Sequence, residues 1–204
     1  MSGVAAEIDG RVEKGKATRD RLLAAARSLF GAKGYEPTSI EEILAAARVK
    51  RGSLYHHFAS KTALFDAVLD QVNADIARRV ADAARAAGPD PVATLRAGCD
   101  AWLQMARDPV VQRIVLLDAP AVVGWNRLRA LDEEHSLGGL RANLRRIARQ
   151  GRLPAREVDL LARMLLAALG EAALLIAHAP AREQREALAA GKAAVDTLLG
   201  RLVG

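Results

Sequence analysis

A short basic segment, residues 50–58, carries side chains that suit binding to a nucleic acid duplex. Arg51 can donate hydrogen bonds to guanine or to phosphate, and Tyr55 and His56 can donate to phosphate oxygens. Gly52 lies between them and would let the backbone come close to the duplex. For an isolated segment of this composition, a solvated basic face without a ligand is the plain alternative.

A helix over this segment would sort its side chains onto two faces. At about 100° per residue, the inward arc consists of Leu54, His57 and Phe58. The outer arc consists of Arg51, Gly52, Tyr55 and His56. Free backbone amides and the helix dipole favour phosphate at a helix N-terminus, and Lys61 lies at the start of the following helix. The segment is therefore a candidate DNA-reading helix.

The element before this segment predicts a supporting helix. From Thr18 onward, apolar residues recur at helical spacing, namely Leu22, Ala26, Leu29 and Phe30. Gly34 supplies a stop signal at the C-terminal end. A helix over about residues 18–33 is therefore expected to pack against the short helices that follow.

Two further signals frame the candidate helix. Thr38 begins a capping box in which its hydroxyl would accept from the Glu41 amide, so a short helix is predicted to run to about Ala47. Ser60 can cap a long helix that Gly88-Pro89 ends. A helix, a tight turn and a second helix, supported by a preceding one, are the layout of a DNA-binding helix-turn-helix.

The run from Thr38 to Phe65, TSIEEILAAARVKRGSLYHHFASKTALF, closely resembles the DNA-binding motif of the TetR family. The resemblance extends over about residues 18–69. It implies that the helix over residues 51–58 enters the major groove and that Tyr55, His56 and Lys61 contact phosphates. It places Lys50, Arg51 and Ser53 at or beside positions that contact bases. The complete set of candidate DNA-binding residues is Thr38, Ser39, Arg48, Lys50, Arg51, Gly52, Ser53, Tyr55, His56 and Lys61.

The turn of the motif departs from the family pattern at two positions. Arg48 occupies the place of a common glycine, and Lys50 occupies the place of the usual serine cap. Glycine at such a turn often adopts a left-handed conformation, which would cost arginine about 1 kcal/mol. A somewhat different turn is therefore expected, with additional positive charge beside the DNA.

The composition predicts an all-α protein, and the start and stop signals along the chain predict about nine helices. Of 204 residues, 51% are hydrophobic and only 3% aromatic, without the excess of β-branched and aromatic residues typical of strand-rich domains. Residues 1–61 hold 11 Lys/Arg against 7 Asp/Glu, a net charge of +4 out of the total of +6. We expect a flexible basic arm over residues 1–16, a helix-turn-helix domain over 17–60 and a helical effector-binding and dimerisation domain over 61–204.

The C-terminal part begins with Asp90-Pro91, an N-cap acid followed by proline, which predicts a helix start. The family resemblance implies that two final helices, about 155–178 and 182–201, form a four-helix homodimer interface. The apolar residues expected there are Leu161, Leu165, Ala168, Ala172, Leu175, Leu188, Val195, Leu198 and Leu199.

The resemblance also implies that the middle helices line a cavity for an unidentified small-molecule effector. Ordinary core packing is the alternative for each of the candidate ligand-binding residues. The candidates are Trp102, Met105, Trp125, Asp118, Asn126 and His135. The implied function is a DNA-binding transcriptional repressor, released by its effector from an operator of inverted-repeat sequence. A helical small-molecule-binding protein or enzyme that keeps the helix-turn-helix as a scaffold is the alternative.

Signals for other chemistry are weak. Cys99 is the only cysteine, so neither an intrachain disulfide nor a thiolate metal cluster is expected. The histidines are scattered or adjacent, and no HExxH, CxxC or GxSxG motif occurs. Residues 10–17 resemble a phosphate-binding loop but have Ala17 in place of the required Ser/Thr. We therefore expect no enzyme activity, no cofactor and no metal.

One apolar stretch, Leu160 to Ala177, approaches the length of a membrane span. Arg163 and Glu171 interrupt it, and each would be costly inside a bilayer. The stretch is therefore interpreted as a buried helix, and with no signal peptide at the N-terminus the expected location is the cytoplasm.

Overall fold

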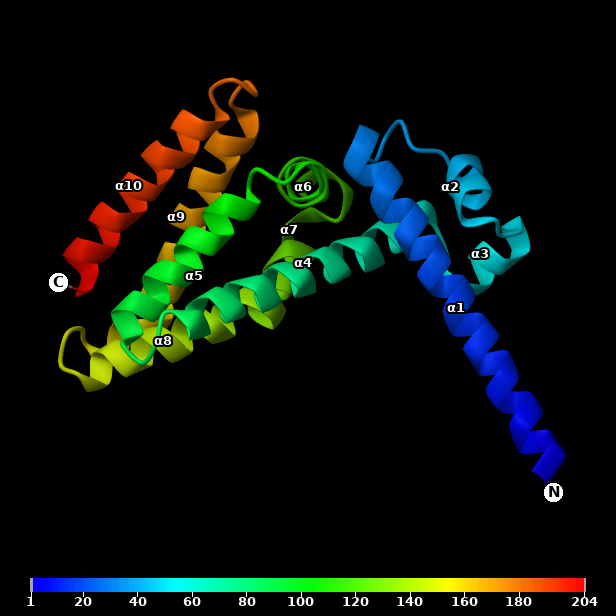
Figure 1. Ribbon diagram of the computed structural model, residues 1–204, viewed down its shortest axis with the longest axis horizontal. Helices are drawn as coiled ribbons and strands as arrows, with labels where there is room; N and C mark the ends of the chain where they lie inside the picture. The colour runs from blue at the N-terminus through cyan, green and yellow to red at the C-terminus, as the bar shows by residue number, and fades with distance from the viewer. Residues whose placement is uncertain (1, 204) are drawn as a thin grey trace.

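The computed structural model describes the backbone of residues 2–203 and the side chains of residues 14–203. Over this range the chain forms helices joined by short turns and contains no strand, which confirms the predicted all-α class (Figure 1). The N-terminal elements are α1 (Ser2–Lys33), α2 (Ile40–Ala47), α3 (Arg51–His57) and α4 (Lys61–Ala86).

Among the C-terminal elements, α5, η1 and η2 pack against α4, and α8, α9 and α10 pack against α5 (Figure 1). They are α5 (Pro91–Met105), the π-helical η1 (Val111–Asp118), the single turn α6 (Ala119–Val122), α7 (Gly124–Leu131), the π-helical η2 (Asp132–Leu137), α8 (Gly138–Arg149), the 3-10 turn η3 (Ala155–Glu157), α9 (Val158–His178) and α10 (Gln184–Val203). Asp90 caps α5 as predicted, since its carboxylate accepts from the Ala93 amide at 2.9 Å.

The first helix is longer than the sequence predicted. α1 begins at Ser2, so the segment expected as an arm over residues 1–16 is helical from Ser2 onward and projects beyond α2 and α3 (Figure 1). The prediction relied on apolar periodicity, which reports burial of a helix face rather than helix formation. Alanine, glutamate and lysine are strong helix formers, and each occurs twice in this stretch.

The cap of α2 lies one residue later than predicted. Ser39, not Thr38, is the N-cap: its hydroxyl accepts from the Glu42 amide at 3.2 Å, and the Glu42 carboxylate accepts from the Ser39 amide at 2.8 Å. The sequence is compatible with both capping boxes, Thr38 with Glu41 and Ser39 with Glu42, because the two glutamates are adjacent. Hydrogen bonds from Lys33 and Ser39 lower the pKa of Glu42 to about 2. The hydrogen bonds to the ionised Glu42 therefore stabilise the folded state fully above pH 4.5, and this stabilisation is lost as the pH falls toward 2.

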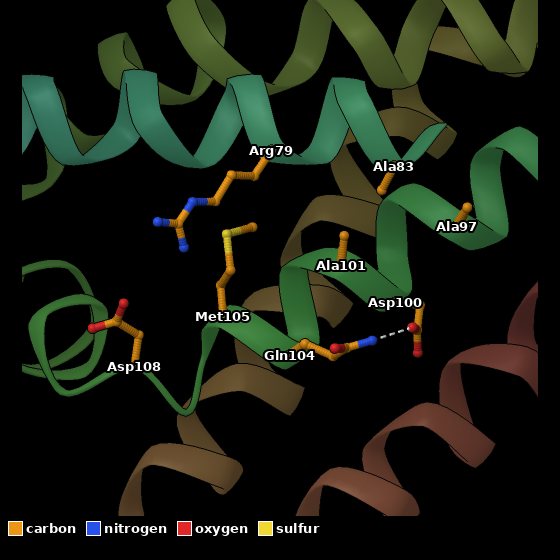
Figure 2. Close-up of a pocket in the computed structure, with 8 residues that line it drawn as sticks. All are labelled: Arg79, Ala83, Ala97, Asp100, Ala101, Gln104, Met105 and Asp108. Carbon is orange, nitrogen blue, oxygen red and sulfur yellow. Dashed lines mark hydrogen bonds between the residues drawn. The ribbon is translucent and has the colours of Figure 1, made fainter. Parts of the chain in front are cut away.

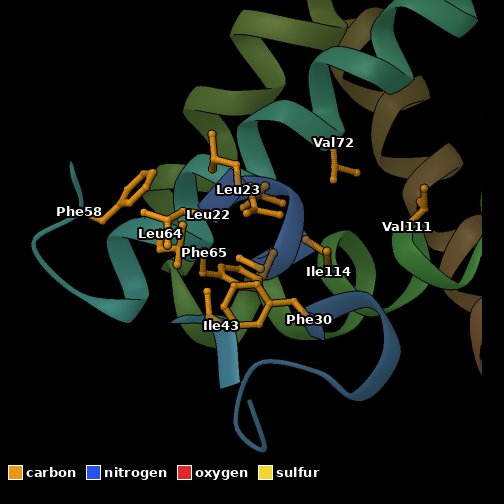
Figure 3. Packing of buried hydrophobic residues seen from close by; sticks show 14 of the residues in the cluster. Leu22, Leu23, Phe30, Ile43, Phe58, Leu64, Phe65, Val72, Val111 and Ile114 are labelled. Carbon is orange, nitrogen blue, oxygen red and sulfur yellow. The ribbon is translucent and has the colours of Figure 1, made fainter. Parts of the chain in front are cut away.

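A first hydrophobic core holds the short helices in place (Figure 3). Phe30 of α1, Ile43 of α2 and Leu54 of α3 are fully buried against Leu64 and Phe65 of α4. The same cluster continues into the C-terminal elements through Val111 and Ile114 of η1 and Leu131 of α7. α4 and η1 therefore connect the helix-turn-helix directly to the rest of the chain.

A second core joins α5, α8, α9 and α10. Among its buried members are Leu103 of α5, Leu144 of α8, Leu169 of α9 and Leu199 of α10. The two cores meet around Trp102, which packs against both.

We predict that Ser39→Ala lowers the free energy of unfolding by about 1 kcal/mol, because the first turn of α2 loses its side-chain acceptor. Urea denaturation at fixed protein concentration measures this change. Ser28→Ala, at an exposed position within α1, is the matched control and should leave stability unchanged or slightly higher. Equal stabilities for the two variants would contradict the capping box.

Candidate nucleic-acid interface

The two faces predicted for α3 are those found in the structure. Leu54 is fully buried and Phe58, just after the helix, is 5% exposed, whereas Tyr55 is 50% exposed. Arg51, Gly52 and His56 are also exposed, and His57 is half-buried. The outer arc is therefore free to approach a ligand, while the inner arc holds the helix in the first core.

Arg51 is already paired within the chain. Its guanidinium donates to the Glu41 carboxylate of α2, and both side chains are more than 60% exposed. Exposed pairs of this kind contribute little to stability, so the guanidinium can exchange Glu41 for a stronger acceptor. Lys50, the N-cap of α3, makes no capping hydrogen bond with its side chain and is exposed. Both cations are thus available at the N-terminal end of the helix.

Lys61 is held in place at the start of α4. Its ammonium lies 4.1 Å from the centre of the Tyr35 ring and donates to the Glu36 carbonyl at 3.3 Å. The Tyr35 hydroxyl lies 2.8 Å from the Thr62 hydroxyl. Tyr35 therefore fixes the N-terminal end of α4, where Ser60 caps the Ala63 amide at 3.0 Å and the helix dipole favours an anion.

The turn between α2 and α3 differs from the expectation at Arg48. This residue is the C-cap of α2 with φ 54° and ψ 48°, so it adopts the left-handed conformation that we expected an arginine to avoid. Its amide donates to the Ala45 carbonyl, and the Val49 amide donates to Leu44, so the turn closes the end of α2. The buried apolar residues on both sides fix the path of the chain, and the side chain at residue 48 accepts the conformation that this path requires.

Thr38, which the sequence placed among the DNA-binding residues, is 1% exposed. Its hydroxyl donates to the Gly34 carbonyl at 2.7 Å. In this structure the Thr38 side chain therefore supports the loop between α1 and α2 and does not face solvent, whereas the neighbouring Ser39 caps α2 at the surface.

A carboxylate from the C-terminal part completes the same loop. Asp118, at the end of η1, accepts from the Tyr35 amide at 2.7 Å and lies 3.3 Å from Nε of Arg113. The Arg113 guanidinium packs so closely on Gly34 that a Cβ at this position would lie 2.2 Å from it, and Gly34 has φ +90°. We refer to these four residues, Gly34, Tyr35, Arg113 and Asp118, as the loop clasp.

Comparisons with known proteins agree with this geometry. Residues 22–68 match the family model described as bacterial regulatory proteins of the tetR family, and residues 92–202 match the one described as the tetracyclin repressor-like C-terminal domain. The chain belongs to the TetR family. It is a DNA-binding transcriptional regulator, and the helix-turn-helix of α2 and α3 is the DNA-binding motif of this family.

Relatives of this TetR-family chain support the assignment along most of its length. The Transposon Tn10 TetC protein of Escherichia coli is 30% identical over 156 residues, which cover 75% of this chain and 77% of TetC. A crystal structure of a TetR-family transcriptional regulator from Pectobacterium atrosepticum superposes with a TM-score of 0.80 at 34% identity and covers 94% of this chain and 96% of that one. The transcriptional repressor DhaR of a Mycobacterium species is 33% identical over 78 residues, which cover 38% of this chain and 39% of DhaR.

The structure does not gather the predicted effector-binding residues of this regulator at one place. Trp102 donates through Nε1 to the Leu169 carbonyl at 3.2 Å, and Asp118 belongs to the loop clasp. Trp125 is 68% exposed with Arg129 over its ring, and Asn126 is also exposed. His135 lies beside Asp70 of α4. Residue type alone carried no signal for these different surroundings.

Of the six, Met105 lines a groove between α4 and α5 (Figure 2). The groove has a volume of about 450 Å³, within the range of small-molecule sites. Its lining residues are Arg79, Ala83, Ala97, Asp100, Ala101, Gln104, Met105 and Asp108. Arg79 and Met105 face each other across it, and the Gln104 amide donates to Asp100 at 2.6 Å along one side.

Cys99 does not provide a reactive thiolate in this structure. The side chain is buried in the second core, and burial raises its pKa to about 12. At neutral pH the thiol is therefore protonated and inaccessible, so it acts as a small apolar residue.

The apolar stretch interpreted as a buried helix is buried on one face only. Ala155–His178, which comprises η3 and α9, is long and apolar enough to cross a membrane, and 28% of its most apolar window is buried. Length and composition are weak grounds for a membrane span, because core helices pass the same test. Ala162, Leu165 and Leu169 face the second core, whereas Leu160 and Met164 are exposed.

We predict that Arg48→Gly raises the free energy of unfolding by up to about 1 kcal/mol, because glycine adopts the left-handed conformation without steric cost. Arg48→Ala is the matched control: it removes the same charge but keeps the strained geometry, so no gain is expected. Urea denaturation of both variants at one protein concentration makes the comparison. A gain of equal size for Ala and Gly would show that charge, not backbone conformation, limits stability at this turn.

Proposed function

We propose that this TetR-family regulator is a homodimeric repressor that binds an operator of inverted-repeat sequence and is released from it by a small-molecule effector. The observation that carries the proposal is the exposed outer arc of α3 beside the fixed ammonium of Lys61. Groups that donate hydrogen bonds are thus available both on the exposed arc of α3 and at the start of α4, which follows after three intervening residues. The excess of basic residues within residues 1–61 favours an anionic partner at the same end.

In the proposed complex α3 lies in the major groove. Tyr55, His56 and Lys61 donate to phosphates and position the protein, whereas Lys50, Arg51 and Ser53 reach base edges. Arg51 must leave Glu41 to contact a guanine, so a site that offers no suitable acceptor gains less from this side chain. Competition from Glu41 would therefore help to select the operator sequence.

We predict that Tyr55→Phe and Lys61→Ala weaken binding to every duplex, whereas Arg51→Ala also relaxes the sequence preference. Loss of a base contact should reduce the preference for the operator by about 5- to 150-fold, the equivalent of roughly 1–3 kcal/mol. Fluorescence anisotropy with the upstream region of the gene and with a scrambled duplex measures both effects.

Arg182→Ala is the control for loss of a positive charge, since Arg182 is 84% exposed and paired with Glu183 outside the helix-turn-helix. It should bind DNA as the wild type does. A wild type that does not distinguish the operator from the scrambled duplex would contradict the proposal. Tight binding or turnover of a small molecule without any salt-sensitive DNA affinity would favour the alternative, in which the helix-turn-helix is only a scaffold.

The homodimer is proposed from an exposed apolar surface on the last two helices. Leu160, Met164 and Leu175 on α9 are 63%, 59% and 64% exposed, and Leu198 on α10 is 43% exposed. The α9 residues are separated by 4 and 11 positions, which places them on one stripe of the helix. Stripes of this kind mark sites of protein association, and a two-fold dimer would pair each stripe with its copy.

The stripe differs in part from the set predicted from the sequence. Leu165, Val195 and Leu199 are buried in the second core of the chain itself, so they face inward and are unavailable to a partner. Leu175 and Leu198 are exposed as the interface requires. The sequence pattern could not separate the two faces, because α9 is apolar on nearly all sides.

We predict that Leu175→Glu converts the dimer to a monomer, because a carboxylate on the stripe would be buried against its copy without a partner. Size-exclusion chromatography with light scattering gives the mass, and operator affinity should fall by at least tenfold with loss of the second recognition helix. Ala81→Glu, at an exposed position of α4, is the control for the added charge and should remain dimeric. A dimeric Leu175→Glu variant would exclude this stripe as the interface.

The effector would act through elements that touch both parts of the chain. Its proposed site lies among the helices around α5, where the groove between α4 and α5 is one candidate. A ligand that favours another packing of η1 would move Asp118, and with it the Tyr35 amide and the Lys61 ammonium above the Tyr35 ring. The loop clasp thus offers a direct route from the C-terminal helices to the DNA-binding surface, in a regulator that we place in the cytoplasm.

A further inference from the structure

Three side chains that can bind metal ions meet between α4 and η2. Asp70 comes from α4, and Glu134 and His135 come from η2. One ligand atom from each lies within 4.8 Å of the other two, and Nε2 of His135 lies 3.0 Å from Oδ1 of Asp70. Asp70 and His135 are 65 positions apart, so no short sequence motif predicts this cluster.

The fold fixes the two residues of η2 from both sides. Leu131 and Leu137, just before and at the end of this π-helical turn, are 3% and 1% exposed and belong to the two cores. A π-helix has more residues per turn than an α-helix, so the consecutive side chains of Glu134 and His135 diverge less in direction. Insertions of this type occur frequently at functional sites.

The charges around the cluster favour a cation. Arg127 donates through Nε to Asp66 at 2.7 Å, and another of its nitrogens lies 3.7 Å from Asp70. Three carboxylates, those of Asp66, Asp70 and Glu134, therefore surround one guanidinium and one imidazole. With a neutral imidazole the group carries an excess of two negative charges. Arg127 would keep Asp66 as its partner if a cation engaged Asp70.

The donor set fits a transition metal better than a hard cation. One imidazole nitrogen and two carboxylate oxygens form a ligand combination found in zinc sites, whereas Mg²⁺ prefers oxygen ligands alone. Bonds of about 2.0–2.1 Å in a tetrahedral site place neighbouring donor atoms about 3.3 Å apart. The distance between His135 and Asp70 is already close to this value, and the donor atom of the exposed Glu134 lies within 4.8 Å of both.

We propose that Asp70, Glu134 and His135 form a binding site for a divalent transition-metal cation of the zinc class, with water as the fourth ligand. The bound ion would join α4 to η2. The proposal does not depend on the DNA-binding role of the chain.

Isothermal titration of the full chain with ZnCl₂, after EDTA treatment and dialysis, tests the proposal. We expect one Zn²⁺ per chain and a rise of the melting temperature on zinc addition, since a ligand that binds the folded state stabilises it. Glu134→Gln and Asp70→Asn should each weaken zinc binding by at least tenfold. MgCl₂ at the same concentrations should neither bind nor raise the melting temperature.

His135→Ala should abolish zinc binding, and His178→Ala is its matched control. His178 is exposed at the end of α9 and should be dispensable for zinc binding. Because His135→Ala also removes the contact with Asp70, the exposed Glu134→Gln keeps the test independent of folding. Cobalt(II) gives a second readout through the visible absorption of a tetrahedral site, which Glu134→Gln should lose.

Two results would overturn the proposal. The first is a wild type without a zinc-dependent rise in melting temperature, which would leave Asp70 and His135 as a hydrogen-bonded pair only. The second is unchanged zinc affinity in both Glu134→Gln and His135→Ala, which would place the ion elsewhere in the chain.

Discussion

The burial of Phe30 and Phe65 against each other is the contact on which the DNA-binding surface depends. The two rings are arranged edge to face with their centroids 5.2 Å apart, and both side chains are fully buried. α2 and α3 contain 8 and 7 residues, too few to form stable helices alone in water. They are helical because Ile43 and Leu54 complete the core that α1 and α4 begin. Because Leu54 is held in this core, the opposite face of α3, the outer arc, is exposed to solvent.

The same core explains how distant parts of the chain can influence this surface. Tyr35 packs on Phe30 and Phe65, carries Lys61 over its ring and donates its amide to Asp118. One residue therefore touches the core, a phosphate-binding candidate and the C-terminal helices. Close-packed protein interiors do not deform continuously, so a change in η1 would shift the whole group rather than one side chain.

Among the side chains that the structure describes, the C-terminal helices leave more large apolar ones exposed to solvent than the N-terminal helices do. The second core buries one face of α9, and the stripe of Leu160, Met164 and Leu175 remains exposed. In the homodimer that we propose, a second copy would cover this surface and set the distance between two recognition helices. In that dimer, α4 would link assembly to DNA recognition, since it extends from Lys61 to its contacts with α5 and η2.

The sequence by itself determined the features that depend on short spacing. Helix periodicity, the Asp90-Pro91 start and the inward arc with Leu54 follow from neighbours within a turn or two, and the family motif fixed the DNA-binding role. Tertiary structure alone decided that Ser39 caps α2, because Thr38 with Glu41 and Ser39 with Glu42 were equally possible from the sequence. It also decided that Arg48 is left-handed, because the packing on both sides of the turn outweighed the preference of arginine for negative φ. It also brought Asp118 to Tyr35 and His135 to Asp70, 83 and 65 positions apart, because such contacts arise only when the helices have packed.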